Sequence, residues 1–343
     1  MLAANFTVFA EEGSLQNTQI RTLQYSTPAN LSHLIKSIQP ITQFEILWRP
    51  SIQISKRGKR GNGHGSKYAN SDEMKSCQEI VVPDCIRRLY GIGTTEEYRN
   101  SGSFLGVAGL DKEYPKSSAV STFLQQYCPE QVDRTFNVIP LNGGLDPQDD
   151  VIDDDAEASA DVDYTVCLAT HAEVQFYSIG NGTADGSAVH HRQDPIQILL
   201  QNLLNRPATQ LPNILSISYG SPERNFQVDQ AIRLCDLFEA VTHRGVSIIV
   251  AARDEGVGDY CYLGDAPRSM PIFPSSCPYV TSVGATMFSK PEIVAPWSSG
   301  GFSEIFSRPD YQNSMVPEYL KSIGSTYLDY TMPKAEVSQT SLR

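Results

Sequence analysis

The sequence predicts an α/β fold in which a mostly parallel sheet is covered by helices on both faces. Short apolar runs rich in valine and isoleucine are typical of strands that are buried on both faces. Segments with apolar residues at helical spacing separate these runs, an alternation expected of parallel strands joined by helices. With 343 residues, of which 40% are hydrophobic, the chain can bury a sizeable core in one large domain or two.

Strands and helices are expected to alternate from Ile80 onward. The expected strands are apolar runs that end at glycine or polar residues, and they span 104–110, 174–178, 214–220 and 246–252. The expected helices carry apolar residues at helical spacing; one begins near Glu157, and the others span 120–127, 196–204 and 226–243.

The first 76 residues differ in composition from the rest of the chain. Residues 1–45 combine short apolar runs with a helical pattern between Leu31 and Ile38, so we expect part of a small α+β unit there. Residues 46–76 are rich in glycine and hold basic pairs at 56–57 and 59–60, which indicates a linker. The basic pairs fit either a solvated loop or the site of a processing protease.

Charge and hydropathy exclude two kinds of partner. Acidic residues outnumber basic ones by 39 to 27, for a net charge of −12, whereas binding to nucleic acid requires clustered lysine and arginine. No apolar run reaches the 18 residues or so that a membrane-spanning helix needs. We therefore expect neither a nucleic-acid nor a membrane partner.

The compartment is left open by the sequence. Residues 1–7 lack the basic start and apolar stretch of a signal peptide, which taken alone indicates the cytosol. Glycosylation acceptors of the type Asn-x-Ser/Thr, which are used in secreted proteins, occur at Asn5, Asn30 and Asn181.

The seven cysteines show no zinc-site spacing. Two pairs could close loops as disulfides, Cys77–Cys85 and Cys261–Cys277. Scattered buried thiols would fit the same sequence equally well.

A pair of carboxylates is the first candidate for chemistry. Glu157 and Asp161 are four residues apart in an expected helix, which places them on one helical face with Cβ atoms about 5–6 Å apart. Two acids this close do not ionise together, so they share a proton and their pKa values separate. The pair can therefore act as a proton relay.

Polar residues at the ends of two expected strands are the second candidate. The strand 214–220 ends in Ser218-Tyr219-Gly220, and Asp254 follows the strand 246–252. In parallel sheets, ligands and catalytic groups gather at the carboxyl ends of the strands. A single polar residue there is more often a turn former or helix cap, but two such ends together with an acid pair favour a catalytic site.

These residues resemble motifs of the sedolisins, or serine-carboxyl peptidases, and among them the secreted fungal tripeptidyl peptidases. The resemblance runs in order over about residues 77–330, and residues 1–45 resemble the end of the family's propeptide, most clearly at 22–26. The matching segments are Glu157-x-x-x-Asp161, the strand 216–220, Asp254 with the glycines that follow it, 273–284 and 298–303.

The resemblance implies a subtilisin-like sheet in a peptidase domain over 77–343, preceded by a partial propeptide domain at 1–45 and a linker at 46–76. It also implies a secreted, acid-active monomer that releases tripeptides from peptide or protein substrates. Glu157 would be the general base and Asp161 its proton-sharing partner. Asp254 would donate a hydrogen bond to the oxyanion while protonated. Ser218, Tyr219 and Gly220 would pair with the extended substrate.

The chain also departs from the family pattern. Arg253 replaces a glycine, so we expect it to disfavour a positive φ and, as a cation, to favour the ionised form of Asp254. The family's Gly-Thr-Ser-x-Ser, which carries the nucleophile, does not follow Tyr327, and the calcium site expected near the C-terminus is missing too. We therefore expect a chain that is truncated at both ends and inactive as written.

Two other interpretations remain open. A homologue without a nucleophile, including the product of a degraded gene, could bind peptides at 218–220 without cutting them. In an unrelated α/β protein, Glu157 and the acidic residues at 153–155 would form only a solvated surface.

Overall fold

A computed structural model gives the structure of the chain. It describes residues 77, 80–92, 102–110, 112–148, 156–180, 194–256, 261–263, 266–268, 271–287 and 293–323, with 3–4, 7–10, 18–22, 25–26 and 49–50 near the N-terminus.

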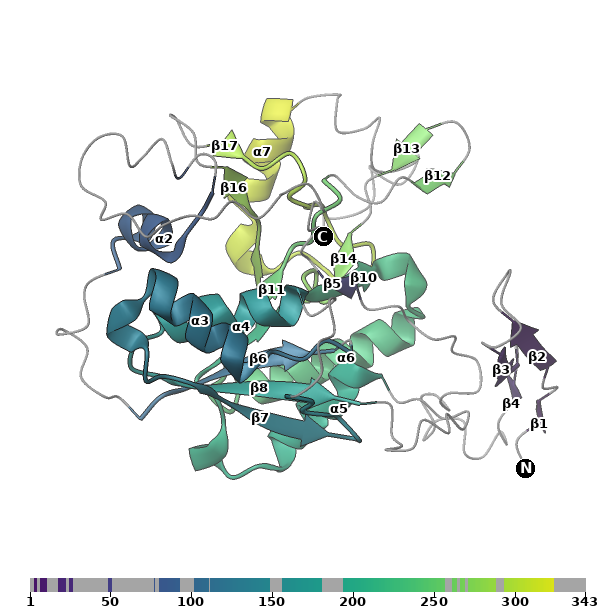
Figure 1. Ribbon diagram of the computed structural model, residues 1–343. Helices are drawn as coiled ribbons and strands as arrows, with labels where there is room; N and C mark the ends of the chain where they lie inside the picture. The colour runs from purple at the N-terminus through teal and green to yellow at the C-terminus, as the bar shows by residue number, and fades with distance from the viewer. Residues whose placement is uncertain are drawn as a thin grey trace.

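The main sheet has six strands, and every neighbouring pair in it is parallel, as predicted (Figure 1). Its strand order is β15-β11-β9-β6-β8-β7. The strands are β6 (Phe104–Gly109), β7 (Phe136–Leu141), β8 (Glu173–Ile179), β9 (Ile214–Ile217), β11 (Ser247–Ala251) and β15 (Thr281–Val283).

Two of these strands were not predicted, and both lie at the edges of the sheet. Strand β7 contains Asn137 and Pro140, which interrupt its apolar run. An edge strand tolerates proline because one side of its backbone has no partner strand. Strand β15 is short and its three residues are exposed, so it lacks the apolar signal of the central strands.

The predicted single strand 214–220 is wrong. The chain forms β9 and β10 (Tyr219–Pro222), separated by Ser218. Strand β10 lies in a second, antiparallel sheet of order β14-β10-β5, with β14 (Ile272–Phe273) and β5 (Arg49–Pro50). The four residues of β10 follow β9 after one residue and are buried, so periodicity alone could not show the change of sheet.

Helices cover both faces of the main sheet (Figure 1). On one face lie α3 (Ser117–Tyr127) and α4 (Ala156–Leu168), and on the other α5 (Pro195–Asn205) and α6 (Val228–Thr242). Each face has its own core. Leu124 and Val162 from α3 and α4 pack with Phe176 of the sheet, and Leu199 and Phe238 from α5 and α6 pack in the other cluster.

Smaller elements surround this centre. They are α2 (Pro83–Tyr90), α7 (Met315–Ile323), four 3-10 turns (Pro129–Gln131, Ala208–Gln210, Glu223–Asn225 and Asp310–Gln312) and the strand pairs β12–β13 (Cys261–Leu263, Ala266–Arg268) and β16–β17 (Thr286–Met287, Ile293–Val294).

Four short strands lie apart from the main sheet near the N-terminus (Figure 1). They are β1 (Ala3–Ala4), which pairs with β4 (Tyr25–Ser26), and β2 (Thr7–Ala10), which pairs with β3 (Thr18–Arg21). The predicted helix between Leu31 and Ile38, the basic pairs of the linker and the three glycosylation acceptors lie outside the described residues. The division into domains therefore stays a prediction.

Three disulfides join the described residues: Cys77–Cys85, Cys128–Cys167 and Cys235–Cys277. The first was a predicted pair. The predicted pair of Cys261 with Cys277 is wrong, because Cys277 bonds to Cys235 on the buried side of α6. Their Cα atoms lie 5.6 Å apart across the core, a closeness that distance along the chain does not reveal.

Candidate active site

The candidate site lies where three parallel strands end. Glu113 follows β6, Ser218 follows β9 and Asp254 follows β11. Strands β6 and β9 are neighbours from which the chain continues toward opposite sides of the sheet. In parallel sheets this is the place where ligands bind. Helix α4 contributes the remaining two acids, Glu157 and Asp161.

The two acids of α4 differ in exposure. The Glu157 side chain is buried, with 2% of its surface exposed, and Asp161 is partly buried. The pKa of Asp161 is raised to about 7, mainly by burial; a hydrogen bond from Ser218 lowers it, and the charge of Glu113 raises it. Asp161 is therefore protonated under acidic conditions, with burial as the main cause.

Glu113 is a third acid at this place, and the sequence analysis missed it. Its Oε2 accepts hydrogen bonds from the backbone N–H groups of Glu157, at 2.9 Å, and Ala158, at 3.1 Å. These N–H groups belong to the first turn of α4, so the Glu113 carboxylate caps the helix and its charge lies at the positive end of the helix dipole. The rule that selected Asp254, a polar residue soon after a buried strand, would have selected Glu113 as well.

Ser218 contacts the acid pair directly. Its hydroxyl donates a hydrogen bond of 2.9 Å to Oδ1 of Asp161. A residue that the sequence analysis placed on the substrate side therefore holds a member of the acid pair.

Tyr219 and Gly220 lie in β10 and are buried. A Cβ atom on Gly220 would lie 2.6 Å from Cγ2 of Ile272, so the close approach of β14 requires glycine here. On its other side, β10 pairs antiparallel with β5, with Tyr219 opposite Pro50 and Gly220 opposite Arg49. The strand predicted to pair with an extended peptide thus pairs with an extended segment of its own chain.

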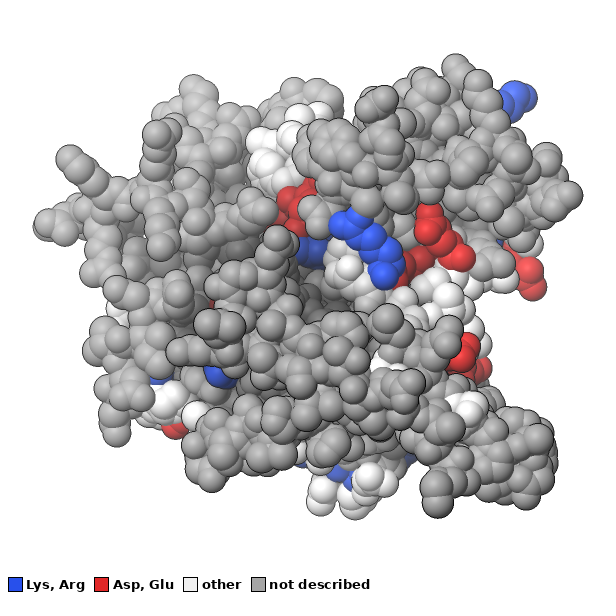
Figure 2. Space-filling view, turned by 90° about the vertical axis from the view of Figure 1, so that its right-hand side faces the viewer, with Lys and Arg blue, Asp and Glu red and all other residues white. Residues whose placement is uncertain are grey.

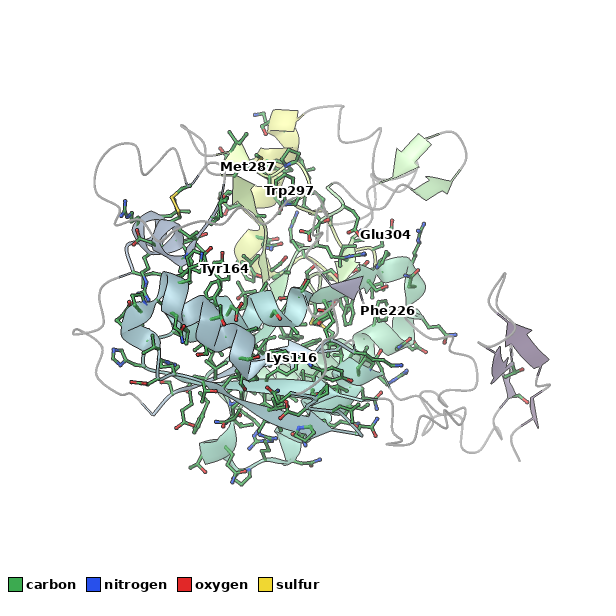
Figure 3. All side chains as sticks on the ribbon, in the orientation of Figure 1. Lys116, Tyr164, Phe226, Met287, Trp297 and Glu304 are labelled. Atoms are coloured by element: carbon green, nitrogen blue, oxygen red, sulfur yellow. A yellow bond between two sulfur atoms is a disulfide. The ribbon has the colours of Figure 1, made fainter. Side chains whose placement is uncertain are left out.

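Hydrogen bonds from the loop 297–299 hold the turn that carries Asp254. The Gly256 N–H donates to the Trp297 carbonyl and the Ser299 N–H to the Arg253 carbonyl, both at 2.8 Å. The Glu255 N–H also donates to Oγ of Ser299, at 3.0 Å. Trp297, labelled in Figure 3, begins this loop. The segment 298–303, which resembles a family motif, therefore helps to fix the turn at Asp254 through hydrogen bonds.

Arg253 adopts the conformation that its side chain was expected to disfavour. Its φ is 80°, although this region costs a residue with a Cβ atom about 1–2 kcal/mol. The hydrogen bond from the Ser299 N–H to its carbonyl and a 2.5 Å ion pair between its guanidinium and Glu255 hold it there. The side chain is 3% exposed, and its Cδ lies 3.5 Å from where a Cβ of Gly220 would be.

Arg253 acts on Asp254 in the expected direction, because its charge lowers the pKa of Asp254, but two larger effects outweigh it. Burial raises the pKa of Asp254, and the charge of Glu255 adds to this, while Arg253 only partly offsets the two. Burial is the main physical reason, and the Arg253 guanidinium that opposes it is itself paired with Glu255. Protonation of Asp254 is favoured, as hydrogen-bond donation from this carboxyl group requires.

Strand β10 joins the two parts of the site. At one end Ser218 bonds to Asp161, and two residues later Gly220 packs against Arg253, the neighbour of Asp254. Together these residues place two acids with raised pKa beside a strand that accepts an extended chain. This arrangement suits acid–base chemistry on a peptide.

The described residues do not supply a metal site. No group of three or more histidine, cysteine, aspartate or glutamate side chains among them could hold a metal ion. The calcium that the family resemblance implies therefore stays a prediction.

Comparisons with known proteins give fungal relatives. The chain is 35% identical over 324 residues to tripeptidyl-peptidase SED4 of Arthroderma otae, which covers 90% of this chain and 52% of that protein. It is 33% identical over 345 residues to the probable tripeptidyl-peptidase SED3 of Arthroderma benhamiae, covering 97% and 56%. The chain thus spans about half the length of the curated relatives it matches. No family model matches it.

Among solved structures, a Pseudomonas sedolisin, described as a serine-carboxyl proteinase complexed with two molecules of pseudo-iodotyrostatin, aligns with a TM-score of 0.46 and 16% identity. That alignment covers 70% of this chain and 66% of the sedolisin.

Proposed function

Because this chain is a relative of fungal tripeptidyl peptidases of the sedolisin family, we propose that it carries the acid relay and peptide-binding strand of an acid-active serine-carboxyl peptidase. The observation that carries the proposal is the hydrogen bond between Ser218 and Asp161, which joins the relay helix to β10. The release of tripeptides is proposed from the names of the relatives alone.

In this proposal each acid has one role. Glu157 accepts the proton of an attacking serine hydroxyl, and Asp161, protonated below a pH of about 7, shares a proton with Glu157. Asp254, whose raised pKa favours the neutral form, donates a hydrogen bond to the oxyanion that develops on the peptide carbonyl. Low pH is needed because Asp254 can donate only while it is protonated.

Strand addition at β10 is the proposed mode of substrate binding. The antiparallel pairing of β10 with β5 supports it, because the same edge accepts an extended segment in this structure. While residues 49–50 occupy that edge, a peptide substrate cannot, so this segment keeps the site closed until it is displaced. This is the behaviour of a zymogen.

We also propose an extracellular location. Three disulfides support it, because disulfides persist in oxidising compartments. Within the described part of the chain, no helix is both long enough and apolar enough to span a membrane. On the face that Figure 2 shows, the largest group of described basic atoms lies beside acidic ones, and the other described basic atoms are scattered. Peptides and proteins are the proposed partners, and the protein is proposed to act as a monomer.

The sequence Gly-Thr-Ser-x-Ser does not occur in these 343 residues. We therefore propose that the polypeptide of this sequence binds peptides but does not hydrolyse them by itself. A non-catalytic peptide-binding homologue is the second candidate, and the pairing at β10 supports it too. The peptidase and the non-catalytic homologue differ in one respect. Adding a segment that carries Gly-Thr-Ser-x-Ser would restore hydrolysis in the first and not in the second.

Two measurements test the proposal. The 343-residue polypeptide, before and after cleavage between residues 50 and 77 by a trypsin-like protease, is incubated with a chromogenic tripeptide amide from pH 3 to pH 8. We expect no turnover, and turnover that Glu157→Ala abolishes would show that the chain contains its own nucleophile.

Fluorescence anisotropy then measures binding of a labelled alanine-rich peptide. Binding that increases after cleavage is expected, and equal binding by Gly220→Val would contradict strand addition at β10.

A further inference from the structure

We infer that Ser218 is a positioning residue for the acid relay: its hydroxyl holds Asp161 in place and fastens α4 to the strand that binds peptide. This inference rests on the proposed function. It assigns to Ser218 a role in the relay in addition to the backbone pairing expected from the sequence.

The position of Ser218 in the fold supports this role. It is the single residue between β9, in the main sheet, and β10, in the antiparallel sheet. Its Oγ lies 2.9 Å from Oδ1 of Asp161, a residue 57 positions earlier on α4. One side chain thus joins the helix of the relay to the point where the chain leaves the main sheet.

The charged groups around Asp161 show what the Ser218 hydroxyl contributes there. Two carboxyl groups accompany Asp161, Glu157 one turn earlier on α4 and Glu113 at the helix start. The adjacent α3 and β6 contain no charged residue. Arg87 of α2 bonds to the carbonyl of Cys167, at the far end of α4. In the described part of the chain, therefore, the group that donates a hydrogen bond to Asp161 is the Ser218 hydroxyl.

Loss of this donor has a direct consequence. A hydrogen bond to a carboxylate stabilises the charged form and lowers its pKa. Because the bond from Ser218 lowers the pKa of Asp161, Ser218→Ala should raise it, by about one pKa unit for a single hydrogen bond to a charged group. A proton held more tightly by Asp161 would be shared less readily with Glu157.

The test is a titration of Asp161 in the full chain by carboxyl-carbon NMR between pH 4 and pH 9, with Asp161→Asn to assign the signal. Ser218→Ala is expected to raise the pKa by about one unit, Ser218→Cys by less, and Ser218→Thr should restore the original value. The matched control is Ser221→Ala. It removes a nearby serine hydroxyl that accepts a hydrogen bond from Asn225.

An unchanged pKa in Ser218→Ala, or an equal shift in Ser221→Ala, would overturn the inference. Should the alanine variant fail to fold, the threonine and cysteine variants decide the matter by the same titration. The measurement needs no hydrolysis. A shift in Ser218→Ala without peptide binding at β10 would refute the proposed function and leave the contact between Ser218 and Asp161 established.

Discussion

Replacing Asp161 with asparagine should make the stability of the protein less dependent on pH. Burial raises the pKa of Asp161 from 3.8 to about 7 in the folded chain. An acid whose pKa is raised by folding contributes its stabilisation fully below its unfolded pKa, and this contribution is lost as the pH rises through the folded pKa. For Asp161 the loss falls between about pH 4 and pH 7.

The size of this effect follows from the pKa shift. A shift of about three units corresponds to about 4 kcal/mol in the free energy of unfolding. This is an upper value, because the Asp161 side chain keeps some contact with solvent. Asparagine cannot ionise, yet its Oδ1 can still accept the hydrogen bond from Ser218. The variant should therefore lose the part of the pH dependence that Asp161 causes and keep the local geometry.

Urea unfolding at pH 4, 5, 6, 7 and 8 measures the difference. The wild-type free energy of unfolding should fall relative to that of Asp161→Asn across this range. Glu318→Gln, which neutralises an exposed acid on α7, is the control and should follow the wild type. Parallel curves for Asp161→Asn and the wild type would refute the argument. Asp163, whose pKa burial also raises to about 7, is present in both proteins and should leave a remaining pH dependence in each.

Three further substitutions test other parts of the structure. Gly220→Ala should lower the free energy of unfolding by about 1–3 kcal/mol, because its Cβ would meet β14 at 2.6 Å; an unchanged melting temperature would contradict this contact. Arg253→Gly should raise the pKa of Asp254, since it removes the charge that lowers it; an NMR titration that finds a decrease would be the opposite of the expectation. Replacing Cys235 and Cys277 together with alanine opens a loop of 42 residues and should cost about 4 kcal/mol on chain-entropy grounds, as thermal unfolding would show.

Much of the fold could be predicted because its signal is local. Strands β6, β8 and β11 and helix α4 each carry their own apolar pattern, so a window of a few residues reveals them. The edge strands β7 and β15 escaped prediction because an edge position does not require a continuous apolar run.

The candidate site divides in the same way. The sequence by itself determined the spacing of Glu157 and Asp161 on one helical face and the position of Asp254 after a buried strand, because both depend only on local geometry. Tertiary structure decided the rest. It brought Glu113 to the start of α4 and the Ser218 hydroxyl to Asp161, from 44 and 57 residues away.

The direction of the pKa shifts also came from tertiary structure. Asp254 follows Arg253 in the sequence, and this neighbouring cation alone predicts an ionised aspartate. The pKa of Asp254 is nevertheless raised. Proton affinity depends on burial and on which charge the guanidinium meets, and in this fold it meets Glu255. The sequence supplies the acids and their spacing, and the packing around them sets which of them hold protons.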